Sequence, residues 1–393
     1  MKILFLTRWY LPFSGIFVER HAKAVALYND LVVLAVLPGE HSSSLKPVIE
    51  EQPGQSGFTV VRYFYRPSRC RIAMIAGLIN LLKFFVCSVS GYRFVAKQYG
   101  SFDLIHVHIL TRTAVPAFLV KLLTGKPYII SEHWTRYIPE NWGFTNIFRR
   151  ILTRLFVRHA AAVTTVSDFL RTAILDCGLR NEKFVIIPNA IDTVRFSPAG
   201  NRPAILKKKI LHVSTLHERA KNIHGILRVI SILAEQRSDF EVLFIGGEEP
   251  ALGKARMYAS ELGLEIPNVI FKGPVQPGEL AEIYRESSFL LMFSNFESFS
   301  VVIPEALSSG IPVLATSVGG IPEYFNNKAG RLTSPGNEPE LLNNLNFMLD
   351  HFQSFDPEYL SSFIEQRFGL QRVGKQFDDL YRSVLKKAVN KSC

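Results

Sequence analysis

The sequence predicts an α/β protein built from two doubly wound parallel sheets. At 393 residues the chain is longer than one hydrophobic core usually supports, so two domains are expected. Short apolar runs alternate with helical stretches in two successive series, and a segment rich in proline, asparagine and glycine separates the series at residues 188–204. Buried apolar strands that alternate with helices form parallel sheets with helices on both faces.

The first series contains seven predicted strands and the second contains five. Those of the first are ILFLT, LVVLAVL, TVVRYFY, LIHVHIL, YIIS, AVTTVS and FVIIP, and those of the second are KILHVST, EVLFIGG, NVIFKG, FLLMFS and PVLAT. Hydrophobic residues make up 48% of the chain, which is enough to fill two cores and excludes a disordered protein. We expect one domain over residues 1–195 and a second over residues 196–365.

The ends and the cysteines of the chain indicate its compartment. Met1–Leu6 already belongs to a strand-like segment without a cleavage site, so no signal peptide is expected. The four cysteines, at positions 70, 87, 177 and 393, have no paired spacing, which predicts neither zinc nor a disulfide framework. A reducing cytoplasm is the simplest location.

The net charge of +11 is placed unevenly. Residues 1–200 contain 24 Lys and Arg against 12 Asp and Glu, whereas the remainder contains 21 against 22. A basic domain is compatible with nucleic acid, an anionic membrane or an acidic substrate. Because no helix-turn-helix, zinc-finger or RNP pattern is present, we expect no nucleic-acid partner.

The segment of residues 291–325 carries the most informative pattern. An apolar strand, Phe289–Ser294, precedes a short helix that has Pro304 near its start and Gly310 just past its end, the usual asymmetry of helix termini. The N–H groups of residues 299–302 then lie at a helix N-terminus, which suits a phosphate or an oxyanion.

Two carboxylates flank this turn. Glu297 precedes it, and Glu305 lies in the first helical turn, eight positions later. Carboxylates are poor phosphate ligands but good acceptors for sugar or ribose hydroxyls. The pattern therefore predicts recognition of a nucleoside diphosphate that carries a sugar.

This segment resembles the Glu-x7-Glu signature of the retaining family-four glycosyltransferases, which have the GT-B fold. The chain has Ser298 and Ser300 where that family usually has glycines, and Ser300 fits poorly if φ must be positive. The matching residues are Glu297, Phe299, Glu305, Ala306, Gly310, Pro312, Val313, Ala315, Gly319, Gly320 and Glu323. The resemblance implies two Rossmann-like domains facing across a cleft. The segment IPNAIDTVRF resembles the linker that joins the two domains in the family. A C-terminal helix over residues 366–393 is expected to cross back to the first domain.

The resemblance also assigns the diphosphate and the nucleobase to the second domain. Lys221, in HVSTLHERAKNIHG, is the expected diphosphate cation, with Arg219 as a candidate second cation, because Thr215 stands where the family has arginine. The base is expected along Phe271 to Val275, largely through backbone groups. There is no Asp-x-Asp motif, so we expect no metal and no other cofactor.

In the first domain the resemblance indicates Gly15, in a turn between a strand and a helix, and His133, just beyond the strand Tyr128–Ser131. A histidine at a strand end lies where ligands of such sheets bind. His106 and His108 alternate in their strand, so we expect only one of them to face the cleft. His108 is the better candidate, although it can equally be a packed core residue.

The run from Ile72 to Val89 is interrupted only by Lys83 and approaches the length of a membrane span. Lys83 and Asn80 near its middle argue against a true span, which leaves a buried or an interfacial amphipathic helix with a basic edge. The basic residues that accompany it are Arg66, Arg69 and Arg71 before the helix and Arg149, Arg150, Arg154 and Arg158 further on. One interpretation is ordinary surface charge, and the other is docking of the first domain on the inner face of an anionic membrane.

Taken with the resemblance, the sequence predicts a retaining, metal-independent hexosyltransferase. It would move a sugar from a nucleotide sugar to a glycan or lipid-linked acceptor in polysaccharide or glycolipid synthesis. The alternatives are a sugar-nucleotide epimerase or hydrolase on the same fold, and a non-catalytic subunit of a transferase complex. The expected catalytic residues are Glu297, His133 and Lys221, and the expected donor-binding residues are Gly15, Arg219, Lys221, Lys272, Gly273, Val275, Phe299, Ser300, Val301 and Glu305.

Overall fold

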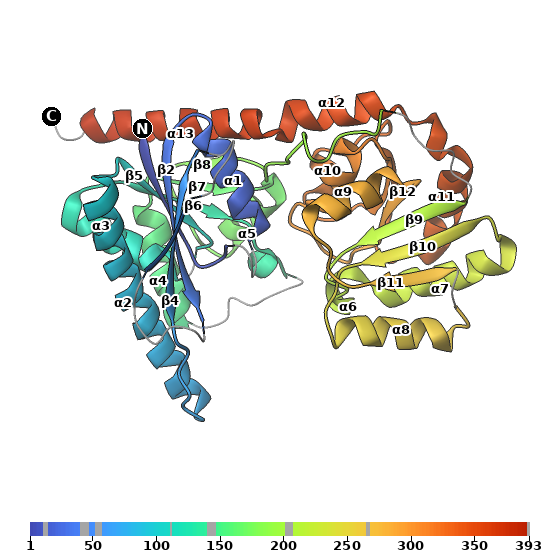
Figure 1. The fold of residues 1–393 in the computed structure, drawn as a ribbon, viewed down its shortest axis with the longest axis horizontal. Helices are drawn as coiled ribbons and strands as arrows, with labels where there is room; N and C mark the ends of the chain where they lie inside the picture. The colour runs from blue at the N-terminus through green and yellow to red at the C-terminus, as the bar shows by residue number, and fades with distance from the viewer. Residues whose placement is uncertain are drawn as a thin grey trace. The chain divides into compact units, whose positions relative to one another are not determined.

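A computed structural model describes residues 1–10, 15–39, 47–51, 57–110, 112–139, 147–200, 207–264 and 268–390. The chain divides into two compact units (Figure 1). The N-terminal unit comprises Met1–Ala190 together with Leu370–Cys393, and the C-terminal unit comprises Ile191–Gly369. Each unit is an α/β layer structure around one sheet.

The N-terminal unit has an eight-stranded sheet in the order β3-β4-β2-β1-β5-β6-β7-β8. All of its neighbouring strands are parallel except the edge pair β3 and β4. Its strands are β1 (Lys2–Thr7), β2 (Asp30–Pro38), β3 (Pro47–Glu51), β4 (Thr59–Tyr65), β5 (Leu104–His108), β6 (Tyr128–Glu132), β7 (Ala162–Thr165) and β8 (Phe184–Ile186).

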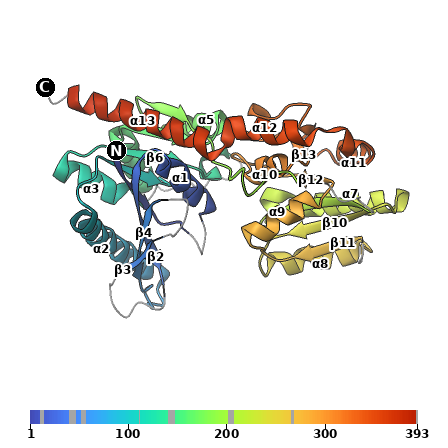
Figure 2. The same cartoon turned by 45° about the horizontal axis from the view of Figure 1, so that its top comes forward.

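Helices cover both faces of this sheet. On one face, α1 and α13 pack against each other and over the central strands, where Phe5, Val33 and Phe377 share one core (Figure 2). On the other face, α2 contacts β2 and β4, and α3 contacts β5 and β6. The helices are α1 (Ile16–Ala26), α2 (Ala73–Tyr99), α3 (Ala114–Thr124), η1 (Thr135–Tyr137), α4 (Ile147–His159), α5 (Asp168–Asp176) and α13 (Leu370–Asn390).

Helix α2 is long and apolar enough to cross a membrane, judged by length and composition alone. Its buried residues, from Phe84 to Val95, all lie in the C-terminal part of the helix. The N-terminal part projects away from the rest of the unit (Figure 1), and Met74 is 82% exposed. In the part of the chain that the structure describes, α2 has no buried side chain before Phe84, so of the two expected environments, buried or interfacial, the buried one fits only its C-terminal part.

The C-terminal unit has a six-stranded sheet in the order β11-β10-β9-β12-β13-β14, and every pair is parallel. Its strands are β9 (Lys208–Val213), β10 (Phe240–Ile245), β11 (Val269–Lys272), β12 (Phe289–Met292), β13 (Val313–Thr316) and β14 (Gly330–Thr333). All twelve strands that the sequence predicts are present. The two missed strands are β3, in which two of the five residues of PVIEE are charged, and β14, a four-residue GRLT segment that starts with glycine.

The helices of the C-terminal unit also cover both faces. Helices α7, α8 and α11 enclose the main apolar core, and α10 packs on α12. The amphipathic C-terminal stretch forms two helices, which meet at Gly369. The helices of this unit are α6 (Glu218–Lys221), α7 (Ile223–Gln236), α8 (Ala251–Glu261), α9 (Pro277–Arg285), α10 (Val302–Ser308), η3 (Ile321–Glu323), α11 (Glu338–His351), η4 (Phe352–Ser354) and α12 (Pro357–Phe368).

Candidate active site

The two motif glutamates lie in the loop after β12 and in α10, at the carboxyl end of the C-terminal sheet. Both side chains are buried, with Glu297 6% and Glu305 4% exposed. Glu297 follows β12 by a short loop, and Glu305 lies in the first turn of α10. A buried carboxylate needs polar partners, and each glutamate has its own.

Glu297 is held by a cation from a neighbouring strand end. Lys221, at the end of α6, donates to Oε1 of Glu297, and Ser294 Oγ donates to the same oxygen at 2.9 Å. The loops that carry the two side chains are tied together, because Asn295 N–H donates to the Ala220 carbonyl at 2.8 Å. The pairing of β9 with β12 thus brings together residues that are 76 positions apart.

The backbone around Glu297 is tightly constrained. Gly319 has φ of 58°, and a Cβ there would lie 1.8 Å from the Glu297 carbonyl oxygen, so only glycine fits. Ser300 also adopts a left-handed conformation, with φ of 62°. The serine therefore keeps the conformation that suits glycine, at a strain of about 1–2 kcal/mol.

Glu305 is held by α9. Tyr284 Oη donates to Glu305 Oε2 at 3.1 Å and to the Val302 carbonyl at 3.3 Å. Tyr284 is fully buried and packs edge-on against Phe196. Sequence reasoning missed Tyr284, because a tyrosine on an amphipathic helix looks like an ordinary core residue.

The other predicted donor-binding residues of this unit fall into different environments. Phe299 packs in the core against Tyr324 and Phe368, so its side chain contributes to packing. Val301 is the N-cap of α10. Arg219 lines a cavity of about 670 Å³ between α6, α7 and α8, whose lining includes neither motif glutamate.

The predicted nucleobase segment follows β11. Lys272 is exposed and pairs with Glu279 on α9. The carbonyl groups of Lys272 and Gly273 accept from Gly246 N–H, at 3.0 and 3.3 Å, so this segment is joined to the end of β10. Gly273 has open space around its Cα, and Val275 lies in the loop before α9.

In the N-terminal unit, Gly15 is the N-cap of α1 with φ of 89°, and a Cβ there would lie 2.5 Å from the Trp9 carbonyl oxygen. His133 lies just beyond β6, and its Nδ1 is 2.9 Å from Asn189 Oδ1. Glu132, which the sequence argument did not single out, fixes this loop. Its carboxylate accepts the N–H groups of Leu110, His133 and Trp134 at 2.9–3.0 Å.

Four buried histidines form a cluster behind this loop. His106 and His108 share one face of their strand, because residues two apart do so, but of the two only His108 lines a cavity at the end of the strand. Their rings stack with centroids 4.2 Å apart. His106 bonds Tyr381 Oη and Ser131 Oγ, at 2.8 and 2.6 Å. His108 lies against His133, and His21 bonds the Pro188 carbonyl at 3.1 Å.

Burial keeps these rings neutral. Desolvation lowers the pKa of His21 to about 4 and lowers the pKa of His106, His108 and His133 well below the ordinary value. Three of them, His21, His108 and His133, place ligand nitrogens within 4.8 Å of one another. One pair of these nitrogens, His108 Nδ1 and His133 Nε2, is 3.4 Å apart, which is about the separation of two nitrogens bound to one tetrahedral zinc.

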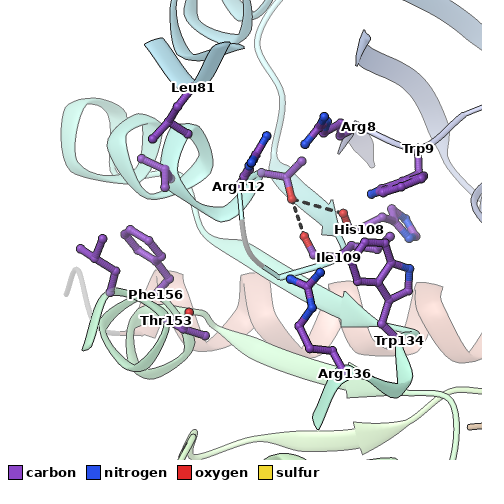
Figure 3. A pocket seen from close by; sticks show the side chains of 13 residues that line it. Arg8, Trp9, Leu81, His108, Ile109, Arg112, Trp134, Arg136, Thr153 and Phe156 are labelled. Atoms are coloured by element: carbon purple, nitrogen blue, oxygen red, sulfur yellow. Dashed lines mark hydrogen bonds between the residues drawn. The ribbon is translucent and has the colours of Figure 1, made fainter. Parts of the chain in front are cut away.

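A cavity of about 470 Å³ lies in the same unit, at the carboxyl ends of β1, β5 and β6 (Figure 3). Three arginines line it, and one follows each of these strands: Arg8, Arg112 and Arg136. The indoles of Trp9 and Trp134 meet edge to face at 5.0 Å, and Arg136 lies 4.6 Å from the Trp134 ring. The sequence argument missed the arginines, although each follows a threonine in the repeated dipeptide Thr-Arg.

Comparison with known proteins supports the assignment of both units. Residues 48–195 match the model of glycosyltransferase family 4, and residues 207–351 match that of the group 1 glycosyl transferases. Among curated proteins, the MMP alpha-(1->4)-mannosyltransferase of Mycolicibacterium hassiacum is 24% identical over 67% of this chain and 66% of its own length.

Solved structures show the same fold. Sucrose-phosphate synthase from Thermosynechococcus elongatus superposes with a TM-score of 0.78 at 16% identity, over 98% of this chain and 100% of that protein. Anabaena HepE, in a complex with UDP-glucose, superposes with a TM-score of 0.73 at 21% identity, over 98% and 100%. The fold is therefore GT-B, with two Rossmann-like domains.

Proposed function

Because the chain is a glycosyltransferase of the family-four type, we propose that it transfers a sugar from a nucleotide-diphosphate sugar to a glycan or lipid-linked acceptor, with retention of configuration. Support for the donor class comes from the buried turn between β12 and α10, and from HepE, which binds UDP-glucose. Such a transfer would serve the synthesis of a polysaccharide or a glycolipid.

The observation that carries this proposal is the ion pair between the buried Glu297 and the partly buried Lys221. Sugar transfer separates charge, because positive charge develops on the sugar ring while negative charge develops on the departing diphosphate. One site that contains a carboxylate and an ammonium can meet both. Glu297 would bind hydroxyls of the sugar and stabilise its cationic transition state, and Lys221 would neutralise the leaving group.

The nucleotide would be held by the remaining groups of the same turn. Glu305, fixed by Tyr284, would accept hydrogen bonds from the ribose hydroxyls. The first N–H groups of a helix have no intrahelical partner, so those near Ser300 would donate to the diphosphate. The backbone of Lys272, Gly273 and Val275 would contact the base.

We propose front-face transfer in which the diphosphate itself assists the acceptor hydroxyl. The C1–O bond to the diphosphate breaks as the acceptor oxygen bonds C1 from the same face, and the hydroxyl proton passes to the departing phosphate oxygen. His133 would contact the donor sugar. Lys221 and the backbone N–H groups would supply the charge that a divalent ion supplies in other transferases, so activity would not need a metal.

The test is a thermal-shift screen of UDP-, GDP- and ADP-sugars, followed by product analysis with and without acceptor, each with and without EDTA. A ligand at 100 times its Kd stabilises the protein by about 2.7 kcal/mol, which is easily measured. We expect one nucleotide to stabilise the protein, and activity to survive EDTA. An altered free sugar nucleotide would instead indicate an epimerase, and hydrolysis without transfer a hydrolase. Failure to bind or hydrolyse any donor would indicate a non-catalytic subunit.

We further propose that the N-terminal unit docks on the inner face of an anionic membrane. The exposed apolar part of α2 and the exposed Arg66, Arg69 and Arg71 before it combine the two contributions that hold a protein at such a surface. On α4, Arg154 and Arg158 are exposed as well, whereas the side chain of Arg149 lies outside the described residues. The protein would then be cytoplasmic and peripheral.

A further inference from the structure

We propose that the cavity lined by Arg8, Arg112 and Arg136 binds the phosphoryl group of an acceptor that also carries an apolar chain. This inference rests on the proposed function, since it names the acceptor class of the same enzyme. It stands on four observations within the N-terminal unit: three arginines grouped together, two indoles beside them, a strained floor, and an apolar wall that continues outside the cavity.

The arginines form a concentration of positive charge. Among the described residues no carboxylate forms an ion pair with any of the three. Glu132, at the end of β6, is buried and accepts three backbone N–H groups, and its charge interacts with that of Arg136. Burial and the charges of Arg8 and Arg136 together lower the pKa of Arg112.

Like charges held in one cavity repel one another, and a bound anion removes this repulsion. The planar guanidinium group is suited to phosphate, which it can bind through two parallel hydrogen bonds. A cavity lined by charges of one sign also concentrates ligands of the opposite sign. The three arginines come from three different loops, so they can surround a phosphoryl group instead of meeting it from one side (Figure 3).

The two indoles supply a surface for the sugar. Trp9 and Trp134 are partly exposed and line the cavity, with Arg136 stacked over Trp134. Indole rings pack well against the apolar face of a sugar ring, and this packing leaves the hydroxyls free. The cavity therefore offers sites for a sugar and for its phosphate side by side.

The floor of the cavity is strained. Ile109, which follows β5, has φ of 67°, an unusual value for a β-branched residue. Thr113 Oγ1 holds it by donating to the carbonyls of Ile109 and His108, at 2.5 and 3.2 Å (Figure 3). Strain of about 1–3 kcal/mol persists only where the surrounding structure enforces it, and here Thr113 enforces it beside the cavity that Arg112 lines.

The opposite wall of the cavity is apolar. It includes Leu81 of α2 and Leu152 and Phe156 of α4. Leu81 and Leu152 are also exposed at 38% and 51%, so the wall continues onto the surface of the unit. On that surface it adjoins further exposed apolar side chains of the two helices: Met74, Ile75, Leu78, Leu82, Ile151 and Leu155.

An exposed apolar strip that leads into an arginine-lined cavity fits an anionic amphiphile. The phosphoryl group would lie among the arginines, the sugar against the indoles, and the chain along α2 and α4. A soluble sugar phosphate has the same phosphoryl group but no apolar chain that could pack against the strip. An amphiphilic phosphate and a soluble sugar phosphate therefore differ in one measurable property, which is the contribution of the apolar chain to binding affinity.

The experiment measures binding directly, without donor or turnover. All three tryptophans of the protein lie in residues 1–190, and two of them line the cavity, so intrinsic fluorescence reports on it. The full-length protein is titrated with inorganic phosphate, decyl phosphate and the neutral decyl glucoside. The variants are Arg8→Gln, Arg112→Gln and Arg136→Gln, each checked for folding by circular dichroism, with Arg180→Gln as the control on an exposed loop.

We expect decyl phosphate to bind at least tenfold more tightly than either of the other two probes. Each cavity variant should weaken it at least tenfold, and Arg180→Gln should leave it unchanged. Leu81→Gln combined with Leu152→Gln should weaken decyl phosphate and not inorganic phosphate. Equal affinity for phosphate and decyl phosphate would show that the ligand needs no apolar chain. Equal affinity of the wild type and a folded Arg112→Gln variant for decyl phosphate would show that the arginine cavity is not the binding site. Because no donor is present, these outcomes are independent of whether the protein transfers sugar.

Discussion

The two units balance their buried and half-buried charges in different ways. In the C-terminal unit, Lys221 and Glu297 neutralise each other in one ion pair. In the N-terminal unit, the arginines of the cavity repel one another, and the nearby histidines are neutral because burial lowers their pKa. The C-terminal site therefore contains both signs of charge that sugar transfer needs. The N-terminal cavity is lined by three arginines, and we propose that an anion completes it.

The difference extends to the response of the units to pH. Among the described residues, the N-terminal unit buries four neutral histidines, and the C-terminal unit buries one, His212, whose pKa desolvation lowers to about 4. A histidine whose pKa is lower in the folded than in the unfolded state destabilises the fold as pH falls below the unfolded value of about 6.5. Acid should therefore unfold the N-terminal unit first.

The largest expected effect is this loss of stability between pH 7 and pH 5. Below the unfolded pKa each buried neutral histidine costs about 1.4 kcal/mol per pH unit, so four approach about 5 kcal/mol per pH unit. Glu132 has the opposite effect on the free energy of unfolding, because burial raises its pKa in the folded state. It is a single group, however, and the four histidines outweigh it. Urea unfolding followed by tryptophan fluorescence measures the N-terminal unit alone, since it contains every tryptophan.

A matched pair of variants isolates the cluster. His108→Gln should reduce the slope of stability against pH by about 1.4 kcal/mol per pH unit, the share of one histidine. His159→Gln, at an exposed position of α4 in the same unit, should leave the slope unchanged. If the wild-type protein is equally stable at pH 7 and pH 5 by this signal, the comparison between the units does not hold.

The next effect concerns the two glutamates of the C-terminal unit. Glu297→Gln keeps the size of the side chain and the hydrogen bond from Ser294, and removes the negative charge that we propose stabilises the sugar. We expect turnover to fall by about 10²–10³-fold with nucleotide affinity largely kept, the scale of losing one electrostatic group of a transition state. Glu305→Ala should instead weaken nucleotide binding. Isothermal titration with the free nucleotide and steady-state kinetics separate the two roles.

Glu235→Gln serves as the control, because Glu235 is exposed on α7. Comparable loss of free-nucleotide affinity in the Glu297 and Glu305 variants would reject the division of roles. A Lys221→Ala variant completes the set. It should lower turnover sharply, and it leaves Glu297 buried without its cation, which costs stability as well.

The strands of both units could be predicted because buried parallel strands are continuous apolar runs that need no knowledge of their neighbours. The strands β3 and β14 lack such runs and are defined by pairing with another strand. The glutamates and Lys221 could be named from their motif, and their contact required the strand order, which places β9 beside β12. Tyr284 was missed because its hydroxyl bonds a carboxylate 21 positions away, a contact that the sequence of its own helix does not reveal.

The arginine cavity shows the same limit in the N-terminal unit. Arg8, Arg112 and Arg136 are far apart in the sequence, and each alone looks like surface charge. They meet because β1, β5 and β6 are neighbours, and ligands of parallel sheets bind at the carboxyl ends of such strands. The repeated Thr-Arg after three predicted strands was the available signal, and it becomes meaningful only once the strand order is known.

The smallest expected effect concerns the surface of the N-terminal unit and the membrane. The protein should sediment with anionic liposomes at low salt and be released by salt, because exposed charges are screened over about 8–10 Å at physiological ionic strength. Changing Arg66, Arg69 and Arg71 together to glutamine should weaken binding by about 1 kcal/mol for each arginine. Donor hydrolysis should not change, because these residues precede α2 and belong to neither site.

The matched control changes Lys97, Lys126 and Arg180 of the same unit, which removes the same charge away from the exposed end of α2. If both triple variants lose binding equally, net charge attracts the unit to the membrane and α2 has no special part. If the protein stays on liposomes through high salt and carbonate, α2 crosses the bilayer, which its length and composition permit. If it fails to bind at low salt, the excess charge of the N-terminal unit serves its acceptor alone. The arginine cavity would then have to bind its ligand without help from the membrane surface.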